Sequence, residues 1–230
     1  MASRPRRLLA EFLGTLLLAA VVVGSGIAAQ TLSPGQPGLE LAENAIATAL
    51  GLGVIIVLLA PISGAHLNPV ISLVDSILGR RSWSDALTYI PVQVAGCIVG
   101  TVLANLMFGE VAVTISTTDR SSPGHFLSEI IATAGLVLVV FLLARQRLER
   151  LAPIAVGAYI GAAYFFTSST SFANPAITIG RIFTGSLAGI APTSVLGFIG
   201  SQLMGGAIGY GLVRLLTAAP KPAEVEGPSA

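Results

Sequence analysis

Two asparagines, Asn68 and Asn174, are each followed by proline, and each pair opens a short apolar segment. Proline at the first position of a helix lacks only an N–H that would be unpaired anyway, and asparagine is a favoured cap, so Asn-Pro is a good helix start. The segments 68–78 and 174–184 are too short to cross a bilayer, so we predict two half-helices. The asparagine amides could hydrogen-bond a passing neutral solute.

Two carboxylates lie within predicted membrane spans, where burying an ionisable group costs free energy. Glu11 and Glu129 lie inside long apolar runs, and such groups usually face the protein interior. Two interpretations are open. The pair could form a proton relay, or each carboxylate could accept hydrogen bonds from the backbone of the half-helix loops.

The composition requires a bilayer as the solvent. Hydrophobic residues make up 53% of the 230 positions and charged residues only 10%, whereas a soluble domain carries roughly a quarter charged residues. The net charge of +1 gives no electrostatic footprint for nucleic acid. One cysteine, Cys97, excludes an intramolecular disulfide and a cysteine-cluster metal site, and two histidines leave little for catalysis or metal binding.

Six apolar runs are long enough to cross about 30 Å of hydrocarbon. They cover residues 8–29, 44–62, 86–108, 127–144, 152–168 and 194–216. We therefore predict an all-α membrane protein with six transmembrane helices and two re-entrant half-helices, in one domain of residues 1–217. Ten of the twelve Lys and Arg residues fall on one side, which predicts cytoplasmic termini and a place in the cell inner (plasma) membrane. The Pro/Ala/Glu-rich residues 218–230 are expected to be a disordered tail.

The two halves of the chain resemble each other. AEFLGTLLLAA resembles SEIIATAGLVL, HLNPVIS resembles FANPAIT, and Gln93 matches Gln202, which indicates a tandem duplication of about 6–108 and 124–216. Three spans per half is an odd number, so the second half must be inverted and the half-helices meet near the midplane. Irregular backbone at that depth predicts a pore, and two helix N-termini there would repel cations.

With the motifs SGAHLNPV and SFANPA on two inverted three-span halves, the chain resembles the aquaporin (major intrinsic protein) superfamily over about residues 6–216. The resemblance implies a homotetramer with a pore in each protomer, passive transport, no enzymatic activity and no cofactor. It also favours the structural interpretation of Glu11 and Glu129. It places the rest of both motifs at the pore midplane: Pro69, Val70, Pro175 and Ala176. Valine at position 70 stands where the family usually has alanine.

The clearest departure from the family pattern is Ile177. Most members carry arginine immediately after the second motif, where it forms a narrow polar filter with three other residues. Isoleucine there predicts a wider constriction. The chain in this respect resembles the aquaglyceroporin-like bacterial channels linked to arsenic resistance.

The other filter positions follow from the same resemblance. Ser171 maps without gaps. On the second span the local match gives Leu50, whereas an ungapped count gives Thr48; on the fifth span the local match gives Tyr164 and the ungapped count gives Ala162.

Vestibule residues are expected at both mouths. Arg181 lies one helical turn after Ile177, so we expect it on the same face at a wider, wetter outer mouth, either as a filter charge or as an anchor for a loop or a neighbouring protomer. Asp75 is its counterpart in the first half, which would give one mouth a cation and the other an anion. His66 is expected in the cytoplasmic vestibule or as a buried histidine bonded to a loop carbonyl.

The function predicted from these features is a passive channel for small neutral solutes: trivalent arsenic or antimony hydroxides, glycerol-like solutes and water. Alternatives are a mainly water-conducting channel and a secondary active transporter, which is also built from inverted repeats with broken helices. The expected partners are neutral solutes, membrane lipids and further copies of the chain, and not nucleic acid.

Overall fold

The computed structural model describes residues 2–218, and every regular element in that range is helical, as predicted. Of the predicted tail, residues 219–230 lie outside the described part. The elements are α1 (Arg4–Leu32), α2 (Pro37–Ser63), α3 (Pro69–Ile77), α4 (Trp83–Met107), α5 (Pro123–Arg145), η1 (Glu149–Leu151), α6 (Ala152–Phe166), α7 (Pro175–Gly180), η2 (Arg181–Phe183) and α8 (Pro192–Leu216).

Five of these helices, α1, α2, α4, α5 and α8, are long and apolar enough to cross a membrane. The fifth predicted span is shorter. Its helix α6 has 15 residues, about 22 Å at 1.5 Å per residue, and the chain turns to extended backbone at Thr167 before the second half-helix.

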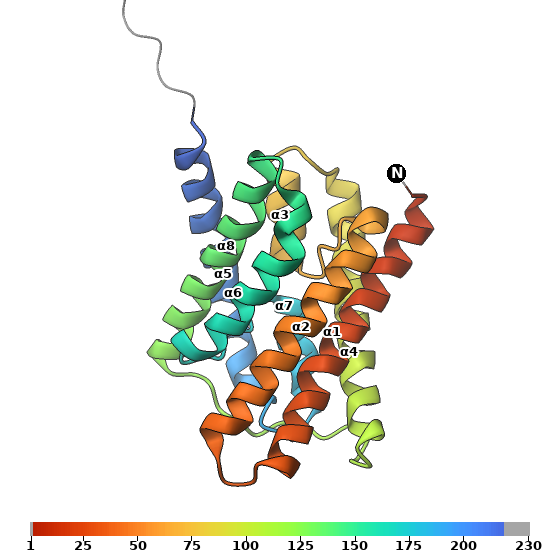
Figure 1. Cartoon of the computed structure of the whole chain (residues 1–230), viewed down its shortest axis with the longest axis vertical. Helices are drawn as coiled ribbons and strands as arrows, with labels where there is room; N and C mark the ends of the chain where they lie inside the picture. Colours follow the sequence, from red (N-terminus) through yellow and green to blue (C-terminus); the bar gives the residue numbers. More distant parts are fainter. Residues whose placement is uncertain (1, 219–230) are drawn as a thin grey trace, which may run out of the picture.

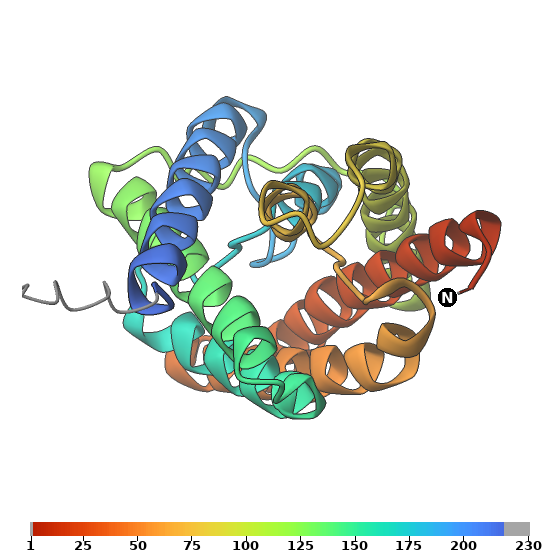
Figure 2. The ribbon, with the colours of Figure 1, turned by 90° about the horizontal axis from the view of Figure 1, so that it is seen from above.

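The half-helices α3 and α7 lie within an open ring of longer helices. Seen from above, the long helices curve around α3 and α7, which fill the gap between α4 and α8 (Figure 2). Helix α1 packs on α2 and α4, α5 packs on α6 and α8, and α2 packs on α6. In Figure 1, α3 occupies the upper half of the molecule and α7 the lower half. The N-terminus and the end of α8 lie together at the upper end, which we call the termini end; the opposite end is the far end.

Glycines set the close spacing of the long helices. A Cβ at Gly100 of α4 would meet the backbone of Leu16 on α1, and a Cβ at Gly209 of α8 would lie 2.8 Å from the carbonyl oxygen of Ala134 on α5. Small residues at these crossings let the backbones approach closely, as they do at helix interfaces in membranes. The α1–α4 and α5–α8 pairs are therefore closely packed, and α3 and α7 pack against α4 and α8 of these pairs.

Candidate functional site

The N-termini of the two half-helices meet inside the ring. Asn68 caps α3 by accepting a hydrogen bond from the Val70 N–H (2.9 Å), and Asn174 caps α7 by accepting one from the Ala176 N–H (3.0 Å). The Nδ2 of Asn68 donates to the Ala173 carbonyl (2.7 Å), which belongs to the other half of the chain. The Nδ2 of Asn174 donates to the Leu67 carbonyl (2.8 Å) in return. This exchange joins the two half-helices end to end.

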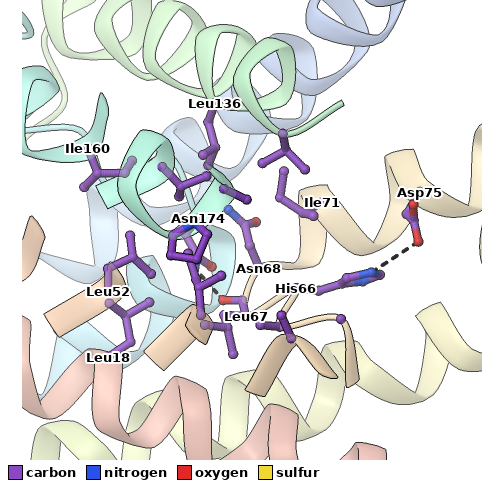
Figure 3. A pocket seen from close by; sticks show the side chains of 18 of the residues that line it. Leu18, Leu52, His66, Leu67, Asn68, Ile71, Asp75, Leu136, Ile160 and Asn174 are labelled. Carbon is purple, nitrogen blue, oxygen red and sulfur yellow. Dashed lines mark hydrogen bonds and ion pairs between the residues drawn. The ribbon is translucent and has the colours of Figure 1, made fainter. Parts of the chain in front are cut away.

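Both asparagines line the internal cavity, and each has a donor to spare (Figure 3). An amide Nδ2 carries two N–H groups, and within residues 2–218 each of these nitrogens makes one hydrogen bond. The prolines and third residues of the motifs were expected beside them at the pore midplane. All four open the half-helices next to the asparagines, are buried against neighbouring elements and contribute no surface to the cavity wall: Pro69, Val70, Pro175 and Ala176. They position the helices instead, and Val70 fits because a glycine, Gly206, faces it.

The loops before both half-helices contain strained backbone. Ala65 and Leu67 have φ values of 47° and 54°, and Thr170, Ser171 and Ala173 have 61°, 50° and 47°. Non-glycine residues in this region cost of order 1–3 kcal/mol each and persist only where their surroundings hold them. Two buried carboxylates supply that restraint.

Glu11 and Glu129 make matching sets of hydrogen bonds. Glu11 accepts from the hydroxyl of Ser63 (2.6 Å), from the N–H groups of His66 (3.0 Å) and Leu67 (2.7 Å), and from Nε2 of Gln93 (2.9 Å).

Glu129 accepts from the corresponding groups of the second half: the hydroxyl of Ser169 (2.6 Å), the N–H groups of Phe172 (2.9 Å) and Ala173 (2.8 Å), and Nε2 of Gln202 (2.6 Å). Neither glutamate is exposed. Each carboxylate therefore ties a strained loop to two long helices, and all four bonds on each leave little capacity for a further partner.

A cavity of about 540 Å³ runs past both asparagines from the termini end toward the far end. Aliphatic and aromatic side chains of α1, α2, α5 and α6 form most of its wall, among them Leu18, Leu52, Leu136 and Ile160 (Figure 3). A largely apolar wall with a few fixed polar groups is the usual construction of a small-molecule site.

Four side chains line the far end of the cavity. Thr48 and Tyr164 join their hydroxyls at 3.2 Å, Ser171 has a buried hydroxyl without a protein partner among the described residues, and Ile177 supplies the apolar side. The prediction of Leu50 is wrong: its side chain is 67% exposed on the outside of the helix ring and does not line the cavity. The ungapped alternative Thr48 lies there, because two residues along a helix turn a side chain by more than half a circle.

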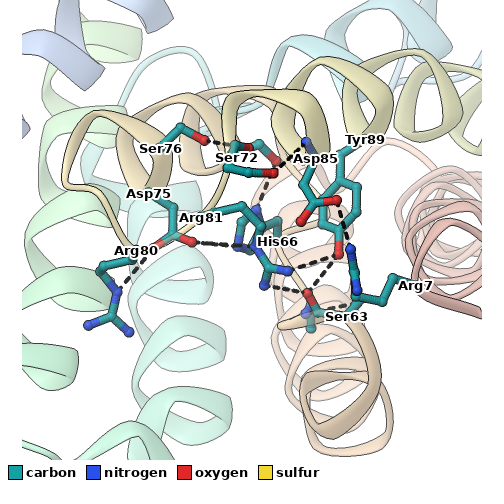
Figure 4. Close-up of polar contacts among 12 residues, drawn as sticks. Arg7, Ser63, His66, Ser72, Asp75, Ser76, Arg80, Arg81, Asp85 and Tyr89 are labelled. Carbon is teal, nitrogen blue, oxygen red and sulfur yellow. Dashed lines mark hydrogen bonds and ion pairs between the residues drawn. The ribbon is translucent and has the colours of Figure 1, made fainter. Parts of the chain in front are cut away.

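The termini end of the cavity carries a cluster of charges around Asp75 (Figure 4). Nε2 of His66 lies 3.2 Å from Asp75 Oδ2, Nε of Arg80 lies 3.1 Å from Oδ1, and Nε of Arg81 lies 3.6 Å from Oδ2. The second ring nitrogen of His66 lies 3.0 Å from the Ser72 hydroxyl. His66 thus lines the cavity and bonds to side chains rather than to a loop carbonyl. The expected anion, Asp75, lies at this mouth, but two arginines, Arg80 and Arg81, offset its charge.

Arg181 was expected at a wide, wet mouth, and that expectation is wrong. The residue is only 2% exposed, lines the cavity and stacks on Phe172, with its guanidinium carbon 3.4 Å from the ring centre.

A second arginine, Arg120, was not singled out from the sequence. Its guanidinium lies 5.1 Å from the centre of the Phe172 ring and donates to the carbonyls of Gly189 (3.0 Å), Leu187 (3.0 Å) and Ser169 (3.4 Å). The only available signal was that it is the single basic residue of the loop 109–122.

Comparisons with known proteins identify the fold and the family. Residues 2–173 match the family model described as Major intrinsic protein. The chain is 46% identical to "Aquaglyceroporin AqpS" of Rhizobium meliloti (strain 1021), over 94% of this chain and 92% of the relative, and 30% identical to the "Glycerol uptake facilitator protein" of Streptococcus pneumoniae (strain ATCC BAA-255 / R6), over 75% and 80%. The X-ray structure of the aquaglyceroporin from Plasmodium falciparum has the same fold, with a TM-score of 0.68 at 22% identity, covering 93% of this chain and 95% of that one.

Proposed function

The chain belongs to the major intrinsic protein family of membrane channels, which are not enzymes, and on that premise we propose which solutes it conducts. It is a passive channel for small neutral solutes. The permeants are trivalent arsenic and antimony hydroxides, with glycerol-like polyols and water.

The observation that carries this proposal is the pair of spare amide N–H groups on Asn68 and Asn174, set in a largely apolar wall. Glycerol and trivalent arsenic hydroxide are both small neutral molecules with three hydroxyl groups. A solute loses hydrogen bonds to water when it enters the cavity, and fixed N–H donors replace part of them. The apolar wall does not bind the solute strongly, so the solute can leave again. Glycerol is also the solute that appears in the names of the relatives from Rhizobium and Streptococcus.

The far-end ring favours a solute larger than water. Its four members, Thr48, Tyr164, Ser171 and Ile177, offer hydroxyls and an aliphatic surface, and the position directly after the second Asn-Pro-Ala motif holds an isoleucine. A hydroxylated solute meets both kinds of surface at once. This ring is the reason for placing arsenic and antimony hydroxides among the permeants.

Active transport would need a free ionisable group at the midplane. Glu11 and Glu129 are the buried acids there, and each already accepts four hydrogen bonds from its own loop and helices. A carboxylate held in this way is a poor site for binding and releasing a coupling ion. Passive flow is therefore the better account.

We also propose that the channel is a homotetramer in the inner membrane of the cell. Both termini of each chain then lie in the cytoplasm. Two ion pairs lie at the termini end, Arg7 with Asp85 (2.7 Å) and Arg80 with Glu149 (3.9 Å), and they place basic residues of α1 and of the turn after α3 at that end. Basic residues concentrate on the cytoplasmic side of membrane proteins.

Reconstitution into liposomes tests the choice of solute. Vesicles containing the protein and protein-free vesicles are mixed with hyperosmotic glycerol, erythritol, arsenite or sucrose at neutral pH, and the shrinkage and recovery of volume are followed by light scattering. The proposal predicts recovery with glycerol and arsenite, faster than in protein-free vesicles, and none with sucrose. Rapid shrinkage without recovery in either permeant would establish a water channel instead.

A further inference from the structure

The guanidinium of Arg181 has donors that no protein group uses. Its Nε donates to the Ala188 carbonyl, which fixes the base of the group. An arginine carries four more N–H donors on its two Nη atoms. Neither Nη of Arg181 donates a hydrogen bond to a residue within 2–218. Neither is sealed off inside the protein without a partner, so both have access to the cavity. Since Arg181 lines the cavity, its Nη groups are the ones that a molecule in the cavity would meet.

Two contacts hold this guanidinium in place. The first is the stacking of the guanidinium on Phe172, with the central carbon Cζ 3.4 Å from the centre of the ring. The same ring is contacted by Arg120, whose three backbone acceptors belong to the loops 167–174 and 184–191. Arg120 therefore fixes the two segments that carry Phe172 and Ala188, and these two residues in turn fix Arg181.

The charge of Arg181 is not neutralised nearby. Among the described residues, neither Arg181 nor Arg120 forms an ion pair. The neighbouring carboxylate, Asp119, is turned to the hydroxyls of Ser121 and Ser194, which hold its pKa below the usual range.

The carboxylate of Glu129 accepts hydrogen bonds from the N–H groups of the loop before α7. At the termini end, by contrast, Arg80 and Arg81 both lie near the carboxylate of Asp75. Arg181 is therefore a cavity-lining cation at the far end that has no ion pair among the described residues.

We infer that Arg181 determines specificity at the far end of the pore: its Nη groups donate hydrogen bonds to the hydroxyl oxygens of the permeant, and its charge rejects cations. Its guanidinium lies over the ring of Phe172, the residue after Ser171. It lines the same cavity as Thr48, Tyr164, Ser171 and Ile177, so it adds donors beside these four side chains. Arg120 is a positioning residue that acts through Phe172. The inference rests on the proposed function, because it names the group that recognises the neutral solute.

The test compares three variants in liposomes. Arg181→Gln removes the charge, Arg181→Lys keeps the charge but loses the fork of donors, and Arg214→Gln removes an exposed arginine at the end of α8 as the matched control. Two quantities are measured for each: the leak of potassium and methylammonium ions, and the ratio of glycerol to water permeability. Elution as a monodisperse species in detergent confirms folding.

The inference predicts a cation leak that rises roughly tenfold or more in Arg181→Gln, as expected when a unit charge is removed from a site of reduced dielectric. Because the group is buried, the rise should persist in high salt, whereas a charge at a hydrated mouth would be screened. Arg181→Lys should keep the low leak and change the glycerol-to-water ratio at least threefold, and Arg214→Gln should match the wild type.

Unchanged leak and an unchanged permeability ratio in folded Arg181→Gln would overturn the inference. If that variant does not fold, Arg181→Lys decides: an altered ratio with low leak supports the inference, and an unaltered ratio overturns it. Wild-type vesicles that pass no glycerol faster than protein-free vesicles would instead refute the proposed function, whatever the variants do.

Discussion

Ile177 separates polyol from water permeation in our account. Its side chain lines the cavity, and its N–H donates to the side-chain Oδ1 of Asn174 at 3.3 Å, so the position of the residue is fixed. Ile177→Arg would place a second guanidinium near Arg181, narrowing the pore and adding strong donors for water. We predict that it lowers the flux of glycerol and arsenite more than the flux of water. Equal loss of all three in the light-scattering assay would indicate plugging and contradict this role.

The spare N–H of Asn174 gives a second prediction at this scale. Asn174→Leu leaves a solute hydroxyl without its partner, at a cost of about 1–3 kcal/mol, or roughly five- to a hundredfold in glycerol flux. Asn105 is the matched control, since its Nδ2 donates to the carbonyls of Ala112 (3.0 Å) and Phe183 (2.9 Å) away from the pore-lining cavity. Folded Asn105→Leu should retain the flux. Equal flux through Asn174→Leu and the wild type would refute the assignment.

The sequence could locate some of these residues and not others. The Asn-Pro pairs identify Asn68 and Asn174, because an asparagine directly before proline at the start of a short apolar segment is placed to cap that helix. Thr48 and Leu50 could not be separated, because α2 is apolar around most of its circumference and its pattern gives no preferred face. The orientation of Arg181 depends on Phe172 and Ala188, which no spacing rule brings together.

At the scale of elements, the buried glutamates restrain the half-helix loops. Glu129→Gln replaces one acceptor oxygen by an N–H₂ group that faces donors, either Ser169 and Phe172 or Ala173 and Gln202. We predict a loss of about 1–3 kcal/mol in stability, measured as a lower Tm in detergent, with Glu110→Gln on the surface as the control. A normal Tm combined with altered pH dependence of flux would favour the proton-relay interpretation instead.

Helix packing gives a prediction with its control on the same helix. A Cβ at Gly209 would lie 2.7 Å from the Val137 Cβ and 2.8 Å from the Ala134 oxygen, while a Cβ at Gly211 would meet nothing within 4 Å. Gly209→Ala should therefore destabilise the protein by about 1–3 kcal/mol through overpacking. Gly211→Ala should leave the Tm unchanged or raise it, because alanine favours helix. The opposite order of Tm values would contradict this packing of α5 on α8.

At the scale of the whole molecule, the apolar runs were sufficient to predict an all-helical membrane protein, because the lengths of spans are set by the thickness of the bilayer. The position of α3 and α7 within the helix ring also followed, from the odd number of spans in each half. The difference between the two ends did not follow. Arg80 and Arg81 reach Asp75 from the turn after α3, whereas the polar and stacking partners of Arg181 within residues 2–218 are a carbonyl and an aromatic ring. The contacts of such long side chains depend on the folded loops.

The central claim is that solutes flow passively through a pore formed by one chain. The most direct test loads purified protein into liposomes and follows labelled glycerol, with and without proton and cation ionophores. The account predicts initial rates that rise linearly with concentration, a final internal concentration equal to the external one, and no effect of ionophores. Accumulation of glycerol above the external concentration, abolished by an ionophore, would contradict it.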